Sequence, residues 1–224
     1  MIVVDVLNDE AGRELLFNKY KIRKVPVLAK GDQYAFGQML EPFVKLAGLA
    51  MPGAQGLTPE QLYRKYEMVF AAAQRYIAQF SEAQLDERAI AHRERIIRVL
   101  CYHIFRIGEA FLETWNGAEY WLKIADNDPP ESIKTGADII AYGRGVWQQY
   151  EQWWAGVEDK SLSRILKTYY GDVTAAKLFE RVTWHSAQHC RQLIDVMGRM
   201  GITPDRPLTA EDLKGLPLPE RVWE

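Results

Sequence analysis

The sequence contains no apolar run near the length that a membrane-spanning helix requires, about 20 residues. Its two cysteines are too few for a disulfide framework, so a reducing compartment, the cytoplasm, is the expected location. The first residues, Met-Ile-Val-Val-Asp, lack the charged and long apolar regions of a signal peptide. Together these absences predict a cytoplasmic protein with no membrane partner.

The chain also lacks a strong excess of charge of either sign. Its formal net charge is −2, whereas binding to nucleic acid requires clustered Lys and Arg that face phosphates. We therefore expect a small-molecule substrate and no nucleic-acid partner. Hydrophobic residues make up 48% and charged residues 26% of the 224 residues, which is typical of a globular protein that can bury a full core.

Glycine and proline cluster at one place, where the chain is expected to divide. Residues 48–59 contain three glycines and two prolines, a composition that is typical of a linker. The pattern predicts an N-terminal segment over residues 1–49, a linker over 50–57, a helical domain over 58–203 and a C-terminal tail over 204–224. The tail, which includes Leu-Pro-Leu-Pro, is expected to be extended and to pack on the surface.

The N-terminal segment has a mixed pattern that predicts the order β-α-β-β-α. Its first residues are β-branched, as in strands, and Asp9 can cap a helix. The expected elements are a strand at 2–6, a helix over about 9–20, a strand at 25–28, a hairpin turn at 30–32, a strand at 34–36 and a helix over about 39–49.

Everything after the linker reads as helix. Thr58 is a predicted N-cap with Pro59 at the first helical position. Four apolar stripes with helical spacing follow, from Leu62 to Phe80, Ile96 to Trp115, Ile140 to Val157 and Leu178 to Met200. A bundle is the simplest way to bury four such faces. The predicted fold class is therefore mainly α, a four-helix bundle with a small N-terminal α/β segment.

Three of the four histidines fall on predicted core faces of two helices. His185 and His189 are four residues apart, so their imidazoles leave the same face of one helix. His103 lies on the apolar stripe of the second predicted helix. Three neutral imidazoles that meet inside a bundle can give zinc three nitrogens at about 2.0–2.1 Å and leave one coordination position open.

A structural zinc site would usually need a fourth protein ligand, most often cysteine. Cys101 is two residues from His103 and Cys190 directly follows His189, so neither thiol shares a face with its neighbouring histidine. The alternative is that the histidines are hydrogen-bonded core residues, because an H-x-x-x-H pair also arises by chance. His92 lies among charged residues and is expected on the surface.

Residues 169–193 read YYGDVTAAKLFERVTWHSAQHCRQL. They resemble the last helix of the DinB/YfiT-like family, in which a polar loop precedes H-x-x-x-H and a glutamine follows three residues later. In this chain those positions are His185, His189 and Gln192, and the family's upstream histidine corresponds to His103. Gln192 could orient a metal-binding imidazole or simply make a hydrogen bond within the bundle.

The resemblance covers about residues 58–203 and has several implications. It implies an up-down-down-up bundle, a histidine-only site for a divalent metal ion (zinc or nickel), and a homodimer. The characterised enzymes of this family are mostly S-transferases and isomerases that use glutathione, mycothiol or bacillithiol.

The first 49 residues resemble the C-terminal half of a glutaredoxin or thioredoxin-like domain, in which Val-Pro carries a cis-proline and a glycine follows the hairpin. No cysteine precedes Cys101, so the redox motif is missing and redox activity is not implied. In glutaredoxins these positions help to hold glutathione, which makes Val25, Pro26 and Gly37 candidate thiol-binding residues. The interpretation that we favour is a module used for packing or dimerisation.

The main functional hypothesis is a metal-dependent transferase or isomerase in which a glutathione-type thiol acts on a small electrophile. The alternative is a non-catalytic, stress-associated protein for metal binding or dimerisation, and a third hypothesis is a redox protein that uses its two cysteines. Glu109 and Glu180 are candidate acids or bases, and Arg191 is a candidate for binding a substrate carboxylate. An open cavity lined by aromatic side chains beside the histidines would favour catalysis over a structural role.

Overall fold

The computed structural model shows a mainly helical chain with two small antiparallel sheets, so the helical prediction is confirmed at this level. The chain divides into two compact units, Met1–Gln55 and Gly56–Glu224. None of the described helices combines the length and the apolar character needed to cross a lipid bilayer. The structure describes residues 2–6, 8–22, 25–36, 40–49, 56–90, 94–120 and 128–223.

The first unit contains two helices and a hairpin, α1 (Glu10–Tyr20), β1 (Val27–Lys30), β2 (Gln33–Phe36) and α2 (Leu40–Ala47). The side chain of Asp9 caps α1 by accepting a hydrogen bond from the Gly12 amide. The two strands are antiparallel, with Lys30 opposite Gln33. The peptide bond between Val25 and Pro26 is cis.

The strand predicted at residues 2–6 is wrong, because no strand forms there. Ile2 and Val3 are 90% and 84% exposed. A β-branched run becomes a strand only when a neighbouring strand accepts and donates its backbone hydrogen bonds. In the described part of this unit β1 and β2 pair with each other, so the order there is α-β-β-α.

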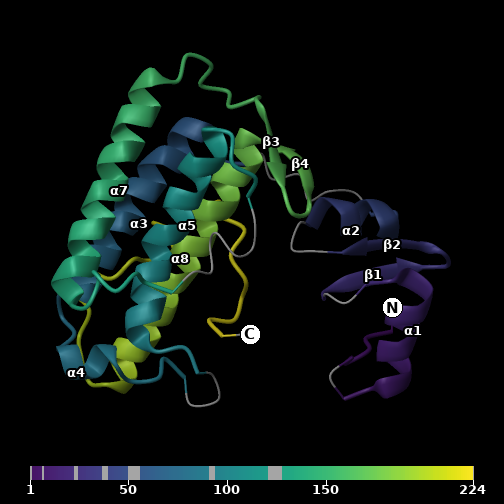
Figure 1. Cartoon of the computed structure of the whole chain (residues 1–224), viewed down its shortest axis with the longest axis horizontal. Helices are drawn as coiled ribbons and strands as arrows, with labels where there is room; N and C mark the ends of the chain where they lie inside the picture. Colours follow the sequence, from purple (N-terminus) through teal and green to yellow (C-terminus); the bar gives the residue numbers. More distant parts are fainter. Residues whose placement is uncertain are drawn as a thin grey trace. The chain divides into compact units, whose positions relative to one another are not determined.

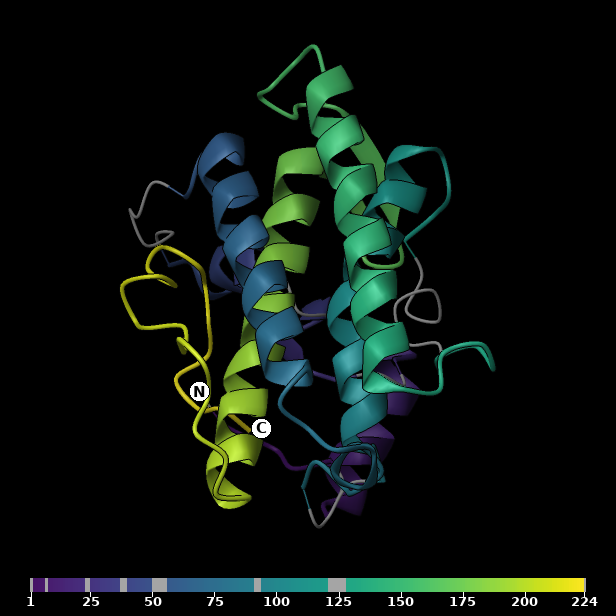
Figure 2. The same ribbon diagram turned by 90° about the vertical axis from the view of Figure 1, so that its left-hand side faces the viewer.

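The second unit is built on four long helices, which lie side by side in Figures 1 and 2. They are α3 (Pro59–Ile77), α5 (Ile97–Trp115), α7 (Gly136–Gly156) and α8 (Ala175–Arg199). Helix α8 packs on α3 and α5, and α7 packs on the same two helices. Thr58, Thr135 and Thr174 cap the N-termini of α3, α7 and α8 with their side chains, as the sequence predicted for α3.

Aromatic side chains fill the space between these helices. Tyr66, Phe70, Phe111, Tyr150 and Phe179 are all at most 1% exposed and contact one another, mostly edge to face. The buried hydroxyl of Tyr150 donates to the carbonyl of Gly108 at 3.0 Å, so its polar end is satisfied inside the core. Aromatic side chains therefore form a large part of the described core.

Two short elements interrupt the region predicted to be entirely helical. Residues 81–85 form a capped turn of helix, α4 (Glu82–Leu85). The strands β3 (Ile165–Thr168) and β4 (Gly171–Thr174) form an antiparallel hairpin just before α8. Gly171 has a φ of +117°, which favours glycine and lets the chain reverse. Four-residue strands are too short to show the two-residue hydrophobic period of a strand, so from the sequence this segment was interpreted as a polar loop.

The C-terminal tail differs from the extended surface segment that was predicted. Its backbone forms a series of turns, and Leu213 and Leu216 are each only 8% exposed within the hydrophobic core. Side chains of α3 hold its backbone: Lys65 donates to the carbonyl of Asp212 at 2.6 Å, and Arg75 to that of Arg206 at 3.1 Å. The tail is thus an integral part of the second unit.

Helix α7 contains a glycine whose hydrogen is the only substituent that fits. A Cβ atom on Gly143 would lie 2.7–2.8 Å from the ring carbons of Phe105, whereas one on Gly145 would meet nothing within 4 Å. Overpacking at such a site costs about 1–3 kcal/mol, so we expect Gly143→Ala to destabilise the protein by that amount.

Gly145→Ala is the matched control on the same helix, and it should stabilise by about 0.5–1 kcal/mol because alanine is the better helix former. Urea unfolding followed by tryptophan fluorescence measures both changes, since all seven tryptophans lie in the second unit. Equal effects of the two substitutions would contradict the close packing at Gly143.

Candidate metal centre

The candidate site lies between α5 and α8, whose relative position is fixed by a buried hydrogen bond. The hydroxyl of Ser186 donates to the carbonyl of Ile104 at 2.9 Å. Tyr66 lies beside this bond, with its hydroxyl 3.3 Å from the Ser186 oxygen. Ser186 directly follows His185, and Ile104 directly follows His103. The two helices are therefore held in register at the level of the histidines.

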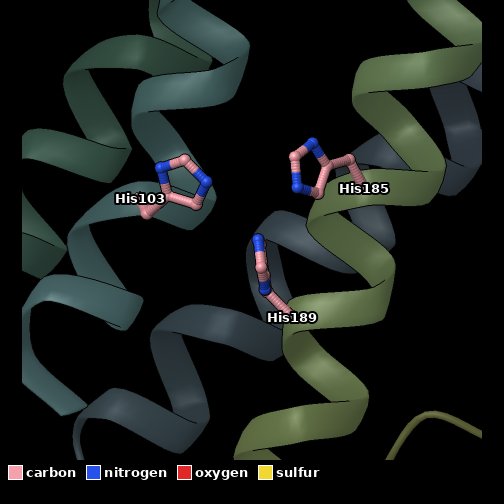
Figure 3. Close-up of side chains that lie close together, drawn as sticks. All are labelled: His103, His185 and His189. Carbon is pink, nitrogen blue, oxygen red and sulfur yellow. The ribbon is translucent and has the colours of Figure 1, made fainter. Parts of the chain in front are cut away.

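The three imidazoles point toward one another from these two helices (Figure 3). The ring centroids of His103 and His189 are 5.0 Å apart, those of His103 and His185 5.6 Å, and those of His185 and His189 4.7 Å. His103 is 5% and His189 7% exposed, and His185 is half-buried. The structure thus brings together the three histidines that the sequence predicted as metal ligands.

The spacing of the ring nitrogens fits a single metal ion after a small adjustment. One nitrogen from each imidazole lies within 4.8 Å of the others. Two nitrogens bound to one tetrahedral zinc ion at about 2.0–2.1 Å are about 3.4 Å apart. The ring nitrogens must therefore approach one another by at most about 1.4 Å, a distance that rotations about the side-chain bonds of the three histidines can share. Among the described residues this is the one cluster of potential metal ligands, and it contains three histidines.

Gln192 determines which ring nitrogen of His189 carries the proton. Its amide nitrogen donates to the carbonyl of Val222 at 3.0 Å, so its oxygen is the atom that lies 2.7 Å from Nδ1 of His189. An amide oxygen can only accept, and Nδ1 must therefore carry the proton. The remaining nitrogen, Nε2, then has its lone pair available for a metal ion, as when a hydrogen-bonded neighbour orients a metal-binding histidine.

The same face of α8 binds the C-terminal tail. The amide nitrogen of Gln188 donates to the carbonyls of Arg221 and Val222 at 3.1 and 2.7 Å. The guanidinium of Arg191 donates to the carbonyl of Pro219 at 2.7 Å and also to Glu220 and Gln188. Arg191 therefore anchors the tail, which leaves it poorly suited to the substrate carboxylate proposed from the sequence.

The electrostatic environment of His185 keeps its imidazole neutral. Burial, together with the neighbouring His189 and His103, lowers the pKa of His185 well below its ordinary value. The positive charges of Arg181 and Arg95 act in the same direction. Neutral imidazole is the form that binds metal, so His185 is in the metal-binding form near pH 7.

The two cysteines are excluded from this chemistry. Both are fully buried, and Cys190 lies against the carbonyl of Val69 at 3.7 Å. Burial raises the pKa of the Cys190 thiol to about 12 and that of Cys101 higher still. Only the thiolate is a good nucleophile or metal ligand, so at neutral pH these side chains are packing residues.

A cavity of about 180 Å³ adjoins the histidine cluster. It reaches His189 and Gln192, and its other walls are apolar except for one arginine. The described residues that line it are Ala89, Ile90, Arg95, Leu100, His189, Gln192 and Trp223. The histidines are therefore adjacent to a space that can hold a small ligand, and one wall of this space is aromatic.

Other candidates from the sequence are not brought to this cluster. The carboxylate of Glu109 accepts hydrogen bonds from Arg106 at 2.9 Å and from Tyr142 at 2.6 Å, so it belongs to a separate polar group on α5. Burial raises the pKa of Glu180, which the charge of Lys177 partly offsets. Neither carboxylate is among the described residues that line the cavity.

The candidate thiol-binding residues lie in the first unit. Val25 is 58% exposed and Pro26 is also exposed. Gly37 and His92 lie outside the described residues. The thiol-binding role of this unit stays a prediction.

Comparison of the sequence with protein-family models finds no match, and comparison with curated proteins finds none either.

The sequence pattern did not reveal two cavity residues, Arg95 and Trp223. Arg95 precedes α5, in a charged stretch that resembles a solvated surface, and Trp223 is one of seven tryptophans. A partial signal was present on α8, where Gln188, Arg191 and Gln192 form a polar strip with helical spacing beside the histidine pair. Polar side chains on a largely buried helix need hydrogen-bond partners, and the backbone carbonyls of the tail accept these hydrogen bonds.

The role of Gln192 can be tested by its removal. Gln192→Ala leaves Nδ1 of His189 without its acceptor, and the loss of such an orienting group typically weakens metal binding about 10–100-fold. Gln188→Ala is the matched control, because it removes hydrogen bonds to the tail but none to His189. Competition with a chromophoric chelator measures the affinity of each variant for the metal ion. Equal losses in the two variants would mean that the tail, and not the orientation of His189, controls the affinity.

Proposed function

We propose that His103, His185 and His189 bind a single divalent metal ion, zinc or nickel. The observation that carries this proposal is the convergence of three imidazoles from two helices beside a cavity of about 180 Å³. The donor set is chemically suitable, since imidazole nitrogens bind both metals and three protein ligands leave a position for a further ligand. Gln192 supports it by holding the tautomer of His189 that exposes Nε2.

We further propose that the second unit is a DinB-like four-helix bundle with up-down-down-up topology. Three features support this proposal. The four long helices pack on one another through a shared core. The histidines occupy the second and last of these helices, at the positions that the resemblance implies. Gln192 contacts His189 directly.

The activity that this arrangement supports best is a thiol-dependent transferase or isomerase acting on a small electrophile. A divalent metal ion bound by three histidines lowers the pKa of a bound water or thiol and so supplies a nucleophile at neutral pH. The imidazoles would hold that ion, and Gln192 would keep His189 in the required orientation. The cavity would hold the electrophile, while Leu100 and Trp223 would limit its contact with water. The thiol would be of the glutathione type.

A non-catalytic, metal-binding protein is the second candidate, and one observation favours it. The hydrogen bonds from His189 through Gln192 to Val222 connect the site to the C-terminal tail, so a bound metal would also stabilise the tail. The cavity beside the histidines favours catalysis, because a purely structural metal has no use for an adjoining space.

Metal analysis of the purified protein tests the first part of the proposal. After purification without chelators we expect near-stoichiometric zinc or nickel, and His185→Ala should reduce the content to a small fraction because two imidazoles bind far more weakly than three. His92→Ala is the matched control, since it removes the one histidine that is not among the three proposed ligands. Wild-type protein without metal under these conditions would contradict the proposal.

A panel of thiols and electrophiles tests the activity. With glutathione and an aryl chloride, for example, a sulfur–carbon bond forms, chloride leaves and the thiol proton passes to solvent. The metal-loaded protein should accelerate at least one such reaction, and His185→Ala should lower the rate by at least about 100-fold. If metal raises the melting temperature but no reaction in the panel is accelerated, the non-catalytic candidate is supported instead.

A further inference from the structure

The end of the C-terminal tail, residues 217–223, is attached to the second unit differently from the rest of the tail. Leu213 and Leu216 are each only 8% exposed and belong to the hydrophobic core, whereas none of residues 217–223 is fully buried. Burial therefore anchors the chain as far as Leu216, and the residues after it can detach without opening the core. Residues 217–223 are called the terminal segment below.

Hydrogen bonds from α8 hold the terminal segment in place. The guanidinium of Arg191 donates to the backbone carbonyls of Pro219 and Glu220 at 2.7 and 3.2 Å. Gln188 and Gln192 donate to further backbone carbonyls of the segment. The net contribution of each such bond is small, because water replaces it when the segment detaches. The terminal segment is therefore expected to open more readily than the helix beneath it.

Trp223, at the end of this segment, forms one wall of the cavity. Its indole nitrogen donates to the carboxylate of Asp195 at 2.7 Å, and the guanidinium of Arg199 lies 5.9 Å from the centre of its ring. The side chain is half-buried and lines the same cavity as His189. It therefore separates part of the cavity from solvent, and the hydrogen bond to Asp195 fixes it there.

The histidine cluster is nearly closed to solvent in this arrangement. His103 is 5% and His189 7% exposed, and His185 is half-buried. A metal ion or a small ligand needs an entry path to reach side chains that are covered to this extent. One path leads past the terminal segment to His189, and the other leads past the more exposed His185. The first path requires the terminal segment to move, whereas the second does not.

We infer that the terminal segment is a lid, which opens to give metal ions and small ligands access to His189, with the bond from Trp223 to Asp195 as its latch. The helices α5 and α8 carry the histidines and cannot separate without destroying the cluster. The terminal segment is held by hydrogen bonds, so it is the wall that can move. The inference concerns the regulation of the proposed site, and it rests on the proposed function only where a metal ion is the probe.

Chemical modification of the metal-free protein measures access to His189. Diethyl pyrocarbonate reacts with neutral imidazoles that solvent can reach, and tandem mass spectrometry of the peptide 182–191 separates His185 from His189. Trp223→Phe keeps an aromatic ring but removes the N–H donor of the latch. It should raise the modification rate of His189 about tenfold, since the loss of one hydrogen bond to a charged acceptor shifts the opening equilibrium by about this factor. The rate at His185 should stay unchanged.

A second variant distinguishes a lid from a fixed wall. Arg191→Met removes the bonds to Pro219 and Glu220 but changes no described residue that lines the cavity. If the segment moves as a lid, this variant should also raise the modification rate of His189 severalfold. Gln79→Ala is the matched control, because its hydrogen bonds go to the part of the tail at residues 203 and 205, before the terminal segment. It should change neither histidine.

The kinetics of zinc binding give an independent measurement. Opening of a lid precedes both entry and exit, so a looser latch multiplies the rates of zinc uptake and release by the same factor. In Trp223→Phe we expect both rates to rise about tenfold and the dissociation constant to stay within about twofold of the wild-type value. A faster release without a faster uptake would show that the segment only braces the site, and would contradict the lid.

Two outcomes of the modification experiment would overturn the inference. A wild-type rate at His189 in Trp223→Phe or in Arg191→Met would place the entry path at His185 or make Trp223 a fixed wall. An equal increase at His185 and His189 would indicate local unfolding of α8. Failure of the proposed function looks different, because a protein that takes up no zinc but shows the expected modification of His189 would refute the metal site and leave the lid intact.

Discussion

The packing of α5 against α8 is the constraint on which the candidate site depends. Neither helix alone can assemble three imidazoles, because α8 carries two and α5 carries one. The bond from Ser186 to the Ile104 carbonyl joins the residues next to His185 and His103, so it sets the helix register at the point where the imidazoles meet. A shift of one residue along either helix would turn its histidine by about 100° and separate the cluster.

The C-terminal tail is part of the site although it follows the last long helix by many residues. Gln192 joins a tail carbonyl to His189, and Asp195 holds Trp223 over the cavity. The histidine cluster and the adjoining cavity therefore share one scaffold, the polar strip of α8. A single helix thus orients an imidazole on one turn and positions a cavity wall on the next, which couples the two parts of the site mechanically.

Local patterns predicted the helices well, because the apolar stripes and Thr58 are signals within a few residues of the elements that they define. The failures also have local reasons. The β-branched residues 2–6 lack a partner strand, and the strands β3 and β4 are too short to show a period. The prediction for the tail failed because Leu213 and Leu216 are buried in a core formed by helices far away in the sequence, and Lys65 of α3 binds the tail backbone beside them.

The sequence by itself determined that His185 and His189 share a face, because the helical repeat places residues four apart on one side. The sequence also predicted His103 as a further metal ligand and Gln192 as a residue that could orient one of the imidazoles. Only the tertiary structure decided that His103 faces the pair, that Arg191 binds the tail, and that Arg95 and Trp223 enclose a cavity beside His189. These relations join segments up to about 130 residues apart, counted from Arg95 to Trp223, and such contacts follow from packing rather than from any local period.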